Sequence, residues 1–157
     1  MADKTGSLIA ASGRYGALMA GASPQHVDTL TEFGERIGVA FQLADDLVDI
    51  TSESMQSGKT PGTDLREGIP TLAGLIALTS EDGADDRLKD LLGRQLPDDA
   101  EHAEALALLR AHPAIAEARK QAHAWSDSAR DLLASLPAGP PRDVLALLCD
   151  YVVSRTG

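Results

Sequence analysis

Hydrophobic positions along the chain recur every three or four residues, which predicts α-helices rather than β-strands. The longest such pattern lies between Ser23 and Thr51. With about 100° of rotation per residue, its apolar side chains fall within half a turn: Leu30, Phe33, Ile37, Ala40, Leu43, Ala44, Leu47 and Val48. A stripe of this width is usually buried against neighbouring helices. The pattern predicts a long amphipathic helix that begins at a Ser23–Pro24 cap.

Glycine, proline and polar residues divide the rest of the chain into shorter helical segments. Helices are expected over residues 7–22, 71–78, 86–93, 98–111, 112–136 and from Pro140 to the tail. Residues 53–70 contain Gly58, Pro61, Gly62, Gly68 and Pro70, and we expect a long flexible loop there. The predicted fold is all-α, with about seven helices over residues 1–157 and no confident strand, and the length fits one domain or a piece of a larger one.

Composition narrows the possible functions. The chain has 24 acidic against 14 basic residues, a formal net charge of −10, and no cluster of basic residues, so nucleic acid is not an expected partner. Only 3% of its residues are aromatic, which argues against an all-β fold.

The single cysteine, Cys149, lies in an apolar helical segment and is expected to be a buried, inert thiol. No apolar run is long enough for a transmembrane segment, so we expect a soluble cytoplasmic protein.

A polar face of the long helix carries the main candidate chemistry. On the same helical wheel, Gln42, Asp45, Asp46 and Asp49 fall on the side opposite the apolar stripe. Like charges at i,i+3 and i,i+4 destabilise a helix, and negative charge near its C-terminal end is disfavoured by the helix dipole. No Lys or Arg occupies a neighbouring i±3 or i±4 position. We therefore expect positive charge to come from outside this helix.

A divalent cation is one candidate for that charge. Carboxylates without nearby His or Cys favour Mg²⁺ over Zn²⁺. An ordinary solvated acidic face is the alternative interpretation. Gly34 and Gly38 either leave room for a ligand or allow close helix packing, and the sequence does not decide between the two. Lys59, in the loop that follows, could reach an anion held by the metal.

Three segments resemble motifs of the trans-isoprenyl diphosphate synthases, in the form common among medium- and long-chain polyprenyl synthases. The second aspartate-rich motif of that family is similar to FQLADDLVDI, Phe41 to Ile50. Its flexible loop is similar to GKTPGTDLREGIPTL, Gly58 to Leu72. Its Lys-Thr helix is similar to KTGSLIAASGRYGALMAGA, Lys4 to Ala22. Three motifs in the right order are more specific than any one alone.

This resemblance implies a helical bundle of the isoprenoid synthase type and a prenyltransferase activity. In that family a Mg²⁺-bound allylic diphosphate ionises, and isopentenyl diphosphate captures the carbocation. By position, the metal would be held by Asp45, Asp46 and Asp49. The allylic diphosphate would be contacted by Lys4, Thr5, Gln42 and Lys59, with Phe41 beside the isopentenyl group. These groups would act mainly through electrostatics, as diphosphate departure builds negative charge.

The resemblance covers only the C-terminal half of such a synthase. The family's first aspartate-rich motif, and the basic residues that bind isopentenyl diphosphate, have no counterpart here. A deliberate truncation, a truncated gene product and a subunit completed by another chain all remain open, as does a homodimer. Two other functions are possible: a non-catalytic regulatory or structural subunit of a prenyl synthase, and a fragment of a class I terpene cyclase. The loop favours chain elongation over cyclisation.

Other polar and aromatic residues are expected to be structural. The four histidines, His26, His102, His112 and His123, are scattered along the chain and are expected to have capping or surface roles, with His112 placed to cap a helix. The pairs Asp85–Asp86 and Asp98–Asp99 look like helix-start residues. Trp125 is expected to serve packing rather than cofactor binding.

Overall fold

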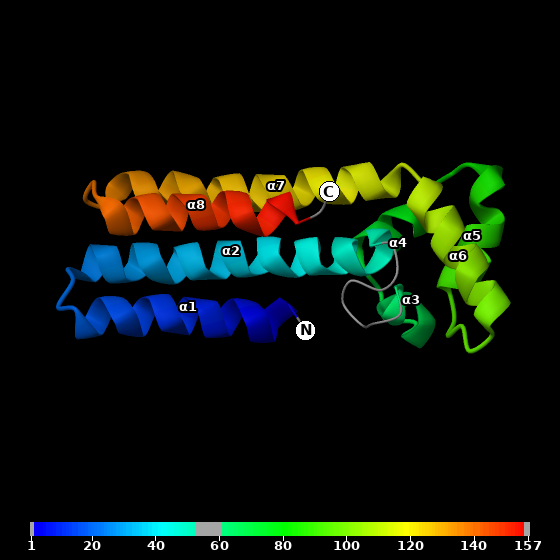
Figure 1. The fold of residues 1–157 in the computed structure, drawn as a ribbon, viewed down its shortest axis with the longest axis horizontal. Helices are drawn as coiled ribbons and strands as arrows, with labels where there is room; N and C mark the ends of the chain where they lie inside the picture. The colour runs from blue at the N-terminus through cyan, green and yellow to red at the C-terminus, as the bar shows by residue number, and fades with distance from the viewer. Residues whose placement is uncertain (1, 53–60, 156–157) are drawn as a thin grey trace. The chain divides into compact units, whose positions relative to one another are not determined.

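The computed structural model describes residues 2–52 and 61–155, and within these ranges every regular element is helical (Figure 1). The all-α prediction is therefore confirmed. The described part has eight α-helices and two 3₁₀ turns: α1 (Ala2–Met19), α2 (Pro24–Thr51), α3 (Thr63–Glu67), α4 (Leu72–Leu78), η1 (Gly83–Asp85), α5 (Asp86–Leu92), α6 (Asp99–Ala111), α7 (Ala114–Leu132), η2 (Leu133–Ser135) and α8 (Pro140–Ser154).

The chain forms two compact units, and each is described by itself. Unit 1 consists of Met1–Ala44 and Gln121–Arg155, and unit 2 consists mainly of Asp45–Lys120. Helices α2 and α7 each contribute one part to unit 1 and the other part to unit 2.

Unit 1 is built from long helices, with α1 beside α2 and α7 beside α8 (Figure 1). The apolar stripe predicted for α2 supplies its core. The buried cluster consists of Phe33, Ile37, Ala40, Ala44, Ala129, Leu133, Cys149, Val152 and Val153. Cys149 is fully buried, and burial raises the pKa of its thiol. The Ser126 hydroxyl donates a hydrogen bond to the Cys149 carbonyl oxygen at 2.8 Å. The expected buried thiol is confirmed.

Glycines on α1 and α2 bring the two helix backbones into close contact. A Cβ atom on Gly34 would lie 2.5 Å from Ala10 Cα, and one on Gly38 would lie 2.5 Å from Gly6 Cα. Real Cβ atoms essentially never approach this closely. Of the two interpretations that the sequence left open, close packing between helices therefore accounts for both glycines.

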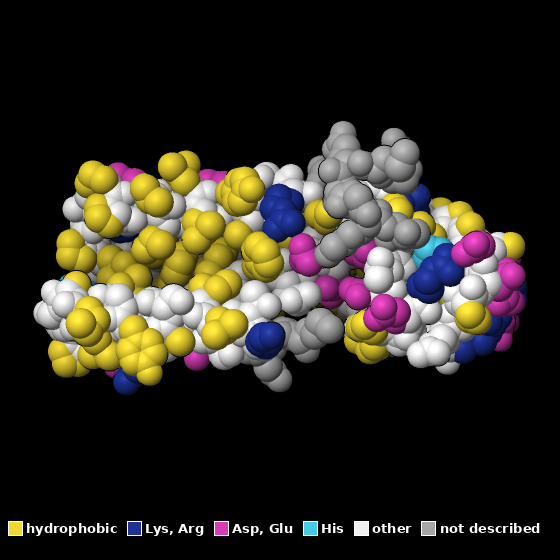
Figure 2. All heavy atoms as spheres, turned by 60° about the horizontal axis from the view of Figure 1, so that its bottom comes forward, with side chains coloured by type: hydrophobic (Ala, Val, Ile, Leu, Met, Phe, Trp, Pro, Cys, Tyr) yellow, Lys and Arg dark blue, Asp and Glu magenta, His cyan; other side chains and the backbone are white. Residues whose placement is uncertain are grey.

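One face of unit 1 leaves large apolar side chains in contact with solvent. Figure 2 shows hydrophobic side chains gathered on this face, between α1 and α8. On these two helices the exposed large hydrophobic residues are Leu8, Tyr15, Leu18, Met19, Val144, Leu147, Leu148 and Tyr151. Exposed apolar patches of this kind on soluble proteins commonly mark contact surfaces.

Unit 2 contains the short helices α3 to α6, and two of them begin at a capping side chain. Thr71 Oγ1 accepts a hydrogen bond from the Gly74 N–H at the start of α4. Asp98 Oδ1 accepts bonds from the Ala100 and Glu101 N–H groups, both at 2.9 Å, at the start of α6. These side chains satisfy N–H groups that a helix leaves unpaired in its first turn.

Three sequence predictions need correction. Helix α3 lies inside the segment 53–70 that was expected to hold no regular element, and residues 53–60 lie outside the described residues. Trp125 was expected to be packed but is 42% exposed. His102 was grouped with scattered surface histidines, but it is 5% exposed.

None of the helices in the described part is both long and apolar enough to cross a lipid bilayer.

Candidate functional site

The predicted metal-binding aspartates lie on the C-terminal part of α2, within unit 2. Asp45 is exposed, whereas Asp46 and Asp49 are half-buried. The Asp49 carboxylate accepts hydrogen bonds from the N–H groups of Thr63, at 3.3 Å, and Asp64, at 3.2 Å. Asp49 therefore caps the N-terminus of α3 from another helix, which satisfies two donors that the short helix leaves unpaired.

Arginine from α6 provides positive charge at the end of the acidic helix. Arg110 Nε donates to the Ile50 carbonyl oxygen at 2.6 Å, and its Nη2 donates to the Ser52 carbonyl oxygen at 2.7 Å. A cation at a helix C-terminus interacts favourably with the helix dipole. Arg110 therefore brings positive charge to the end of the α2 backbone, whereas the neutralisation of the aspartate carboxylates by an outside cation stays a prediction.

His102 is a part of this region that sequence reasoning missed. Its Nε2 lies 2.9 Å from the Gly62 carbonyl oxygen, and its Nδ1 lies 3.2 Å from Arg66 Nη2. The available signal was its position three to seven residues before the apolar residues Ala105, Leu106 and Leu109, which places it on the buried face of α6.

The other predicted site residues that the structure describes belong to unit 1. The Thr5 hydroxyl and Gln42 Oε1 lie 3.5 Å apart, so the structure brings these two predicted residues together. Lys4 is exposed on α1. The Arg155 guanidinium lies 5.2 Å from the centre of the half-buried Phe41 ring, a cation–π distance. Lys59, the remaining predicted residue, lies outside the described residues.

The chemistry of the aspartates fits a hard cation. Within residues 2–52 and 61–155, no three His, Cys, Asp or Glu side chains form a group that could hold a metal ion. Mg²⁺ does not require such a group, because it usually binds one or two carboxylates and completes its octahedron with water and substrate phosphates. Oxygen donors on one helix face are therefore suited to one part of a Mg²⁺ coordination sphere.

A second cluster of polar side chains lies beside a cavity of about 420 Å³ in unit 2. The Asp85 carboxylate accepts a hydrogen bond from the Ser80 hydroxyl and another, at 3.1 Å, from His112 Nε2. These two bonds lower the pKa of Asp85 below its ordinary value of 3.8, and the bond from Ser80 has the larger effect. His112 Nδ1 accepts the Ala114 N–H at 3.0 Å, which confirms its predicted capping role. Since the carboxylate lies between serine and histidine, the cluster lacks the order of a nucleophilic triad.

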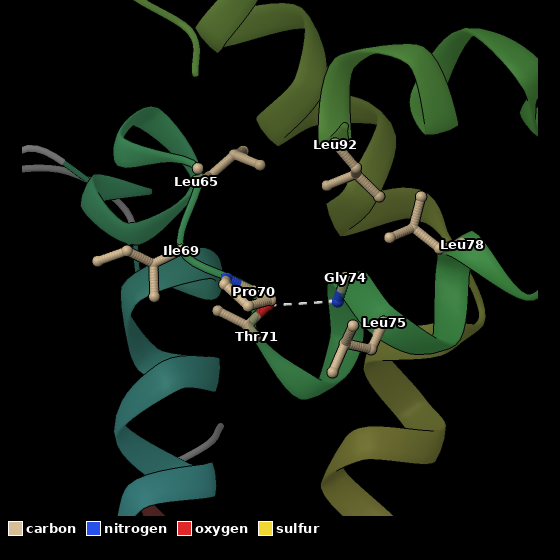
Figure 3. Close-up of a pocket in the computed structure, with 9 residues that line it drawn as sticks. Leu65, Ile69, Pro70, Thr71, Gly74, Leu75, Leu78 and Leu92 are labelled. Atoms are coloured by element: carbon tan, nitrogen blue, oxygen red, sulfur yellow. Dashed lines mark hydrogen bonds between the residues drawn. The ribbon is translucent and has the colours of Figure 1, made fainter. Parts of the chain in front are cut away.

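A small apolar hollow of about 40 Å³ lies between α3, α4 and α5 of unit 2. Figure 3 shows leucine side chains around it, with Thr71 accepting the Gly74 N–H at its edge. Pockets for small-molecule ligands are usually about 300 Å³ or larger. This hollow is therefore too small to bind a prenyl diphosphate.

Comparison with known proteins agrees with these motifs. Residues 1–109 match the family model described as polyprenyl synthetase. Nonaprenyl diphosphate synthase of Mycobacterium tuberculosis is 51% identical over 156 residues, which cover 99% of this chain and 46% of that protein. Heptaprenyl diphosphate synthase component 2 of Geobacillus stearothermophilus is 37% identical over 97% of this chain and 47% of its own length.

A solved structure extends the similarity to the fold. The geranylgeranyl pyrophosphate synthase of Corynebacterium glutamicum, complexed with calcium and isoprenyl diphosphate, superimposes with a TM-score of 0.91 at 38% identity. The match covers 99% of this chain and 48% of the other. This chain spans about half the length of the curated relatives it matches. With a family model matched over more than half of its residues, the chain belongs to the polyprenyl synthetase family.

Proposed function

We propose that this chain is the C-terminal portion of a polyprenyl diphosphate synthase, which binds Mg²⁺ and an allylic diphosphate for condensation with isopentenyl diphosphate. The observation that carries the proposal is the close match to a synthase structure complexed with calcium and isoprenyl diphosphate. The Lys-Thr helix, the aspartate-rich motif and the loop also occur here in that family's order. On this proposal the divalent metal is Mg²⁺.

In unit 2, Asp45, Asp46 and Asp49 are the proposed metal ligands. Bound Mg²⁺ would neutralise charge on the diphosphate as the leaving group departs. The carboxylates supply oxygen donors to that ion, and the capping bonds from α3 hold Asp49 in a fixed orientation. Substrate phosphate oxygens would complete the coordination.

Four residues are the proposed contacts of the allylic diphosphate: Lys4, Thr5, Gln42 and Lys59. The lysines would attract the anion, while the Thr5 hydroxyl and the Gln42 amide would donate hydrogen bonds to it. Phe41 is proposed to lie beside the isopentenyl group. Its ring already carries the Arg155 guanidinium on one face, which limits its orientation.

We propose that the active protein also needs a complementary N-terminal half, as a separate chain or as part of a longer one. The apolar face between α1 and α8 supports this, because solvent-exposed leucine, tyrosine and valine side chains on both helices would be covered by further helices. One relative is named as component 2 of a heptaprenyl synthase. A homodimer is the other proposed assembly.

Calorimetry with farnesyl diphosphate, in the presence and absence of Mg²⁺, tests the binding function. Wild-type chain is expected to bind only with Mg²⁺, and the double variant Asp45→Ala with Lys59→Ala is expected to lose this binding. The double variant Asp127→Ala with Lys120→Ala removes the same charges from exposed positions of α7 and serves as the control. Undiminished binding by the first double variant contradicts the proposed site.

A regulatory subunit without catalytic function is the second candidate, favoured by the relative named as component 2. It would associate tightly with a complete synthase and take up no diphosphate in a metal-dependent way. Calorimetry on the chain alone separates the two, because only the first function requires Mg²⁺-dependent uptake by this chain.

A further inference from the structure

Two side chains of α6, Arg110 and His102, form hydrogen bonds with residues shortly before and shortly after segment 53–60. Arg110 donates to the carbonyl oxygens of Ile50 and Ser52, at the end of α2. Eight residues earlier on α6, His102 contacts the Gly62 carbonyl oxygen, immediately before α3. Helix α6 therefore contacts both the end of α2 and the Gly62 turn that precedes α3.

The contacts of His102 determine which of its ring nitrogens carries hydrogen. A guanidinium has only donors, so Arg66 Nη2 must donate to His102 Nδ1, at 3.2 Å. The proton of the neutral ring is then on Nε2, which donates to the Gly62 carbonyl oxygen at 2.9 Å. Both nitrogens of this 5%-exposed side chain thus have partners that define its tautomer and its ring orientation.

The turn at Gly62 is shaped to accept this histidine. Gly62 has a φ of 73°, in the left-handed region that side chains other than glycine rarely adopt. A Cβ atom at this position would lie 2.9 Å from His102 Nε2 and 3.1 Å from Leu106 Cδ1. The hydrogen bond to the Gly62 carbonyl therefore depends on the absence of a side chain at this residue.

The same turn contacts Asp49 through three backbone donors. The Gly62 N–H donates to the Asp49 carbonyl oxygen at 2.8 Å, and the next two N–H groups, of Thr63 and Asp64, donate to its carboxylate. Displacement of Gly62 would move all three donors together, since they belong to consecutive residues. The orientation of the Asp49 carboxylate is thus linked through one turn to His102.

We propose that His102 and Arg110 are positioning residues of the acidic face: His102 fixes the Gly62 turn and thereby the Asp49 carboxylate, and Arg110 fixes the end of α2. Neither residue is proposed to touch substrate or metal. The importance of this arrangement for ligand binding rests on the proposed function, whereas the positioning itself does not.

Amide hydrogen exchange on the 157-residue chain tests the positioning directly. His102→Leu removes both hydrogen bonds, and His102→Gln keeps a donor for Gly62 and an acceptor for Arg66. We expect exchange at Thr63 and Asp64 to be about tenfold faster in His102→Leu than in wild type and close to wild type in His102→Gln. Ser126→Ala, which removes a buried hydrogen bond in unit 1, is the control for a general loss of stability. In this variant we expect exchange at Thr63 and Asp64 to speed up no more than the fall in the free energy of global unfolding requires.

His102→Asn covers the case in which His102→Leu fails to fold. Its shorter amide can still accept from Arg66 but is too short to reach Gly62, so fast exchange at Thr63 and Asp64 is again expected. Wild-type exchange rates at Thr63 and Asp64 in either variant that folds would overturn the proposal. Arg110→Met is expected to speed exchange at the last turn of α2, with Arg110→Lys intermediate, and an unchanged rate in Arg110→Met would overturn its part.

Binding of inorganic pyrophosphate with Mg²⁺ tests the link to function. We expect affinity about tenfold weaker in His102→Leu and restored in His102→Gln. Equal affinity in all three proteins would overturn the link between the turn and the site. Absence of pyrophosphate binding by wild type would instead count against the proposed function, and the exchange data would then decide the positioning role alone.

Discussion

Substitution of Gly34 by alanine tests the close approach of α1 and α2. The added Cβ would lie 2.5 Å from Ala10 Cα, 2.7 Å from Ala10 N and 2.9 Å from the Ile9 carbonyl carbon. All three are backbone atoms, so no side-chain rotation relieves the contact. Ordinary contact begins at 3.4 Å, and 3.4 − 2.5 = 0.9 Å is the displacement that the nearest atom requires.

The expected free-energy change has two opposing parts. Overpacking of this kind destabilises a protein by about 1–3 kcal/mol. Alanine is favoured over glycine inside a helix by about 1 kcal/mol, which offsets part of that loss. Because helix backbones must separate, we expect the upper part of the overpacking range and a net loss of about 1–2 kcal/mol for Gly34→Ala.

Gly16→Ala is the matched control, since it makes the same substitution in α1 where a Cβ meets nothing within 4 Å. We expect it to stabilise the chain by about 0.5–1 kcal/mol through helix propensity alone. Urea denaturation followed by circular dichroism measures both free energies of unfolding. A stabilisation of Gly34→Ala equal to that of Gly16→Ala would refute the close backbone contact.

Three further predictions concern other parts of the chain. Burial should make the Cys149 thiol unreactive toward a disulfide reagent until the chain unfolds, and rapid reaction of native protein would contradict its burial. Asp85→Asn should lower the free energy of unfolding above pH 3.8, where the ionised carboxylate accepts hydrogen bonds from Ser80 and His112. The difference between variant and wild type should disappear as the pH falls through the lowered pKa of Asp85, and urea unfolding at several pH values measures it. Gly62→Ala should destabilise unit 2 by about 1–2 kcal/mol because of its left-handed φ, and a neutral effect in denaturation would show that the turn adopts another conformation.

Local signals were sufficient to predict most helix boundaries. Pro24 begins α2 with Ser23 before it, and Thr71 and Asp98, the residues at which helices were expected to begin, are the N-caps of α4 and α6. A capping side chain acts within three residues of its own position, so the sequence around it contains the necessary information. The apolar stripe of α2 was predictable for the same reason, since helical periodicity follows from backbone geometry.

Features that depend on distant residues were not predictable. Helix α3 has no side-chain cap from the residue before it, and its first N–H groups are satisfied by Asp49, fourteen and fifteen residues earlier. The burial of His102 depends on a contact with Gly62, forty residues away. The exposure of the Trp125 side chain depends on which neighbouring elements cover that part of α7, which its local sequence did not reveal.

The aspartates of α2 look equivalent in sequence, but the structure gives them different roles, and this difference leads to a final prediction. Asp49 accepts two N–H groups of α3, and loss of such a cap usually lowers stability by about 0.5–2 kcal/mol. Asp45 is exposed, and exposed positions usually tolerate substitution within about 0.5 kcal/mol.

We therefore expect Asp49→Ala to lower both the free energy of unfolding and Mg²⁺-dependent diphosphate binding, and Asp45→Ala to lower binding alone. Urea denaturation and calorimetry on the same two variants measure the two effects. Unchanged stability in Asp49→Ala would mean that its carboxylate does not cap α3 in solution.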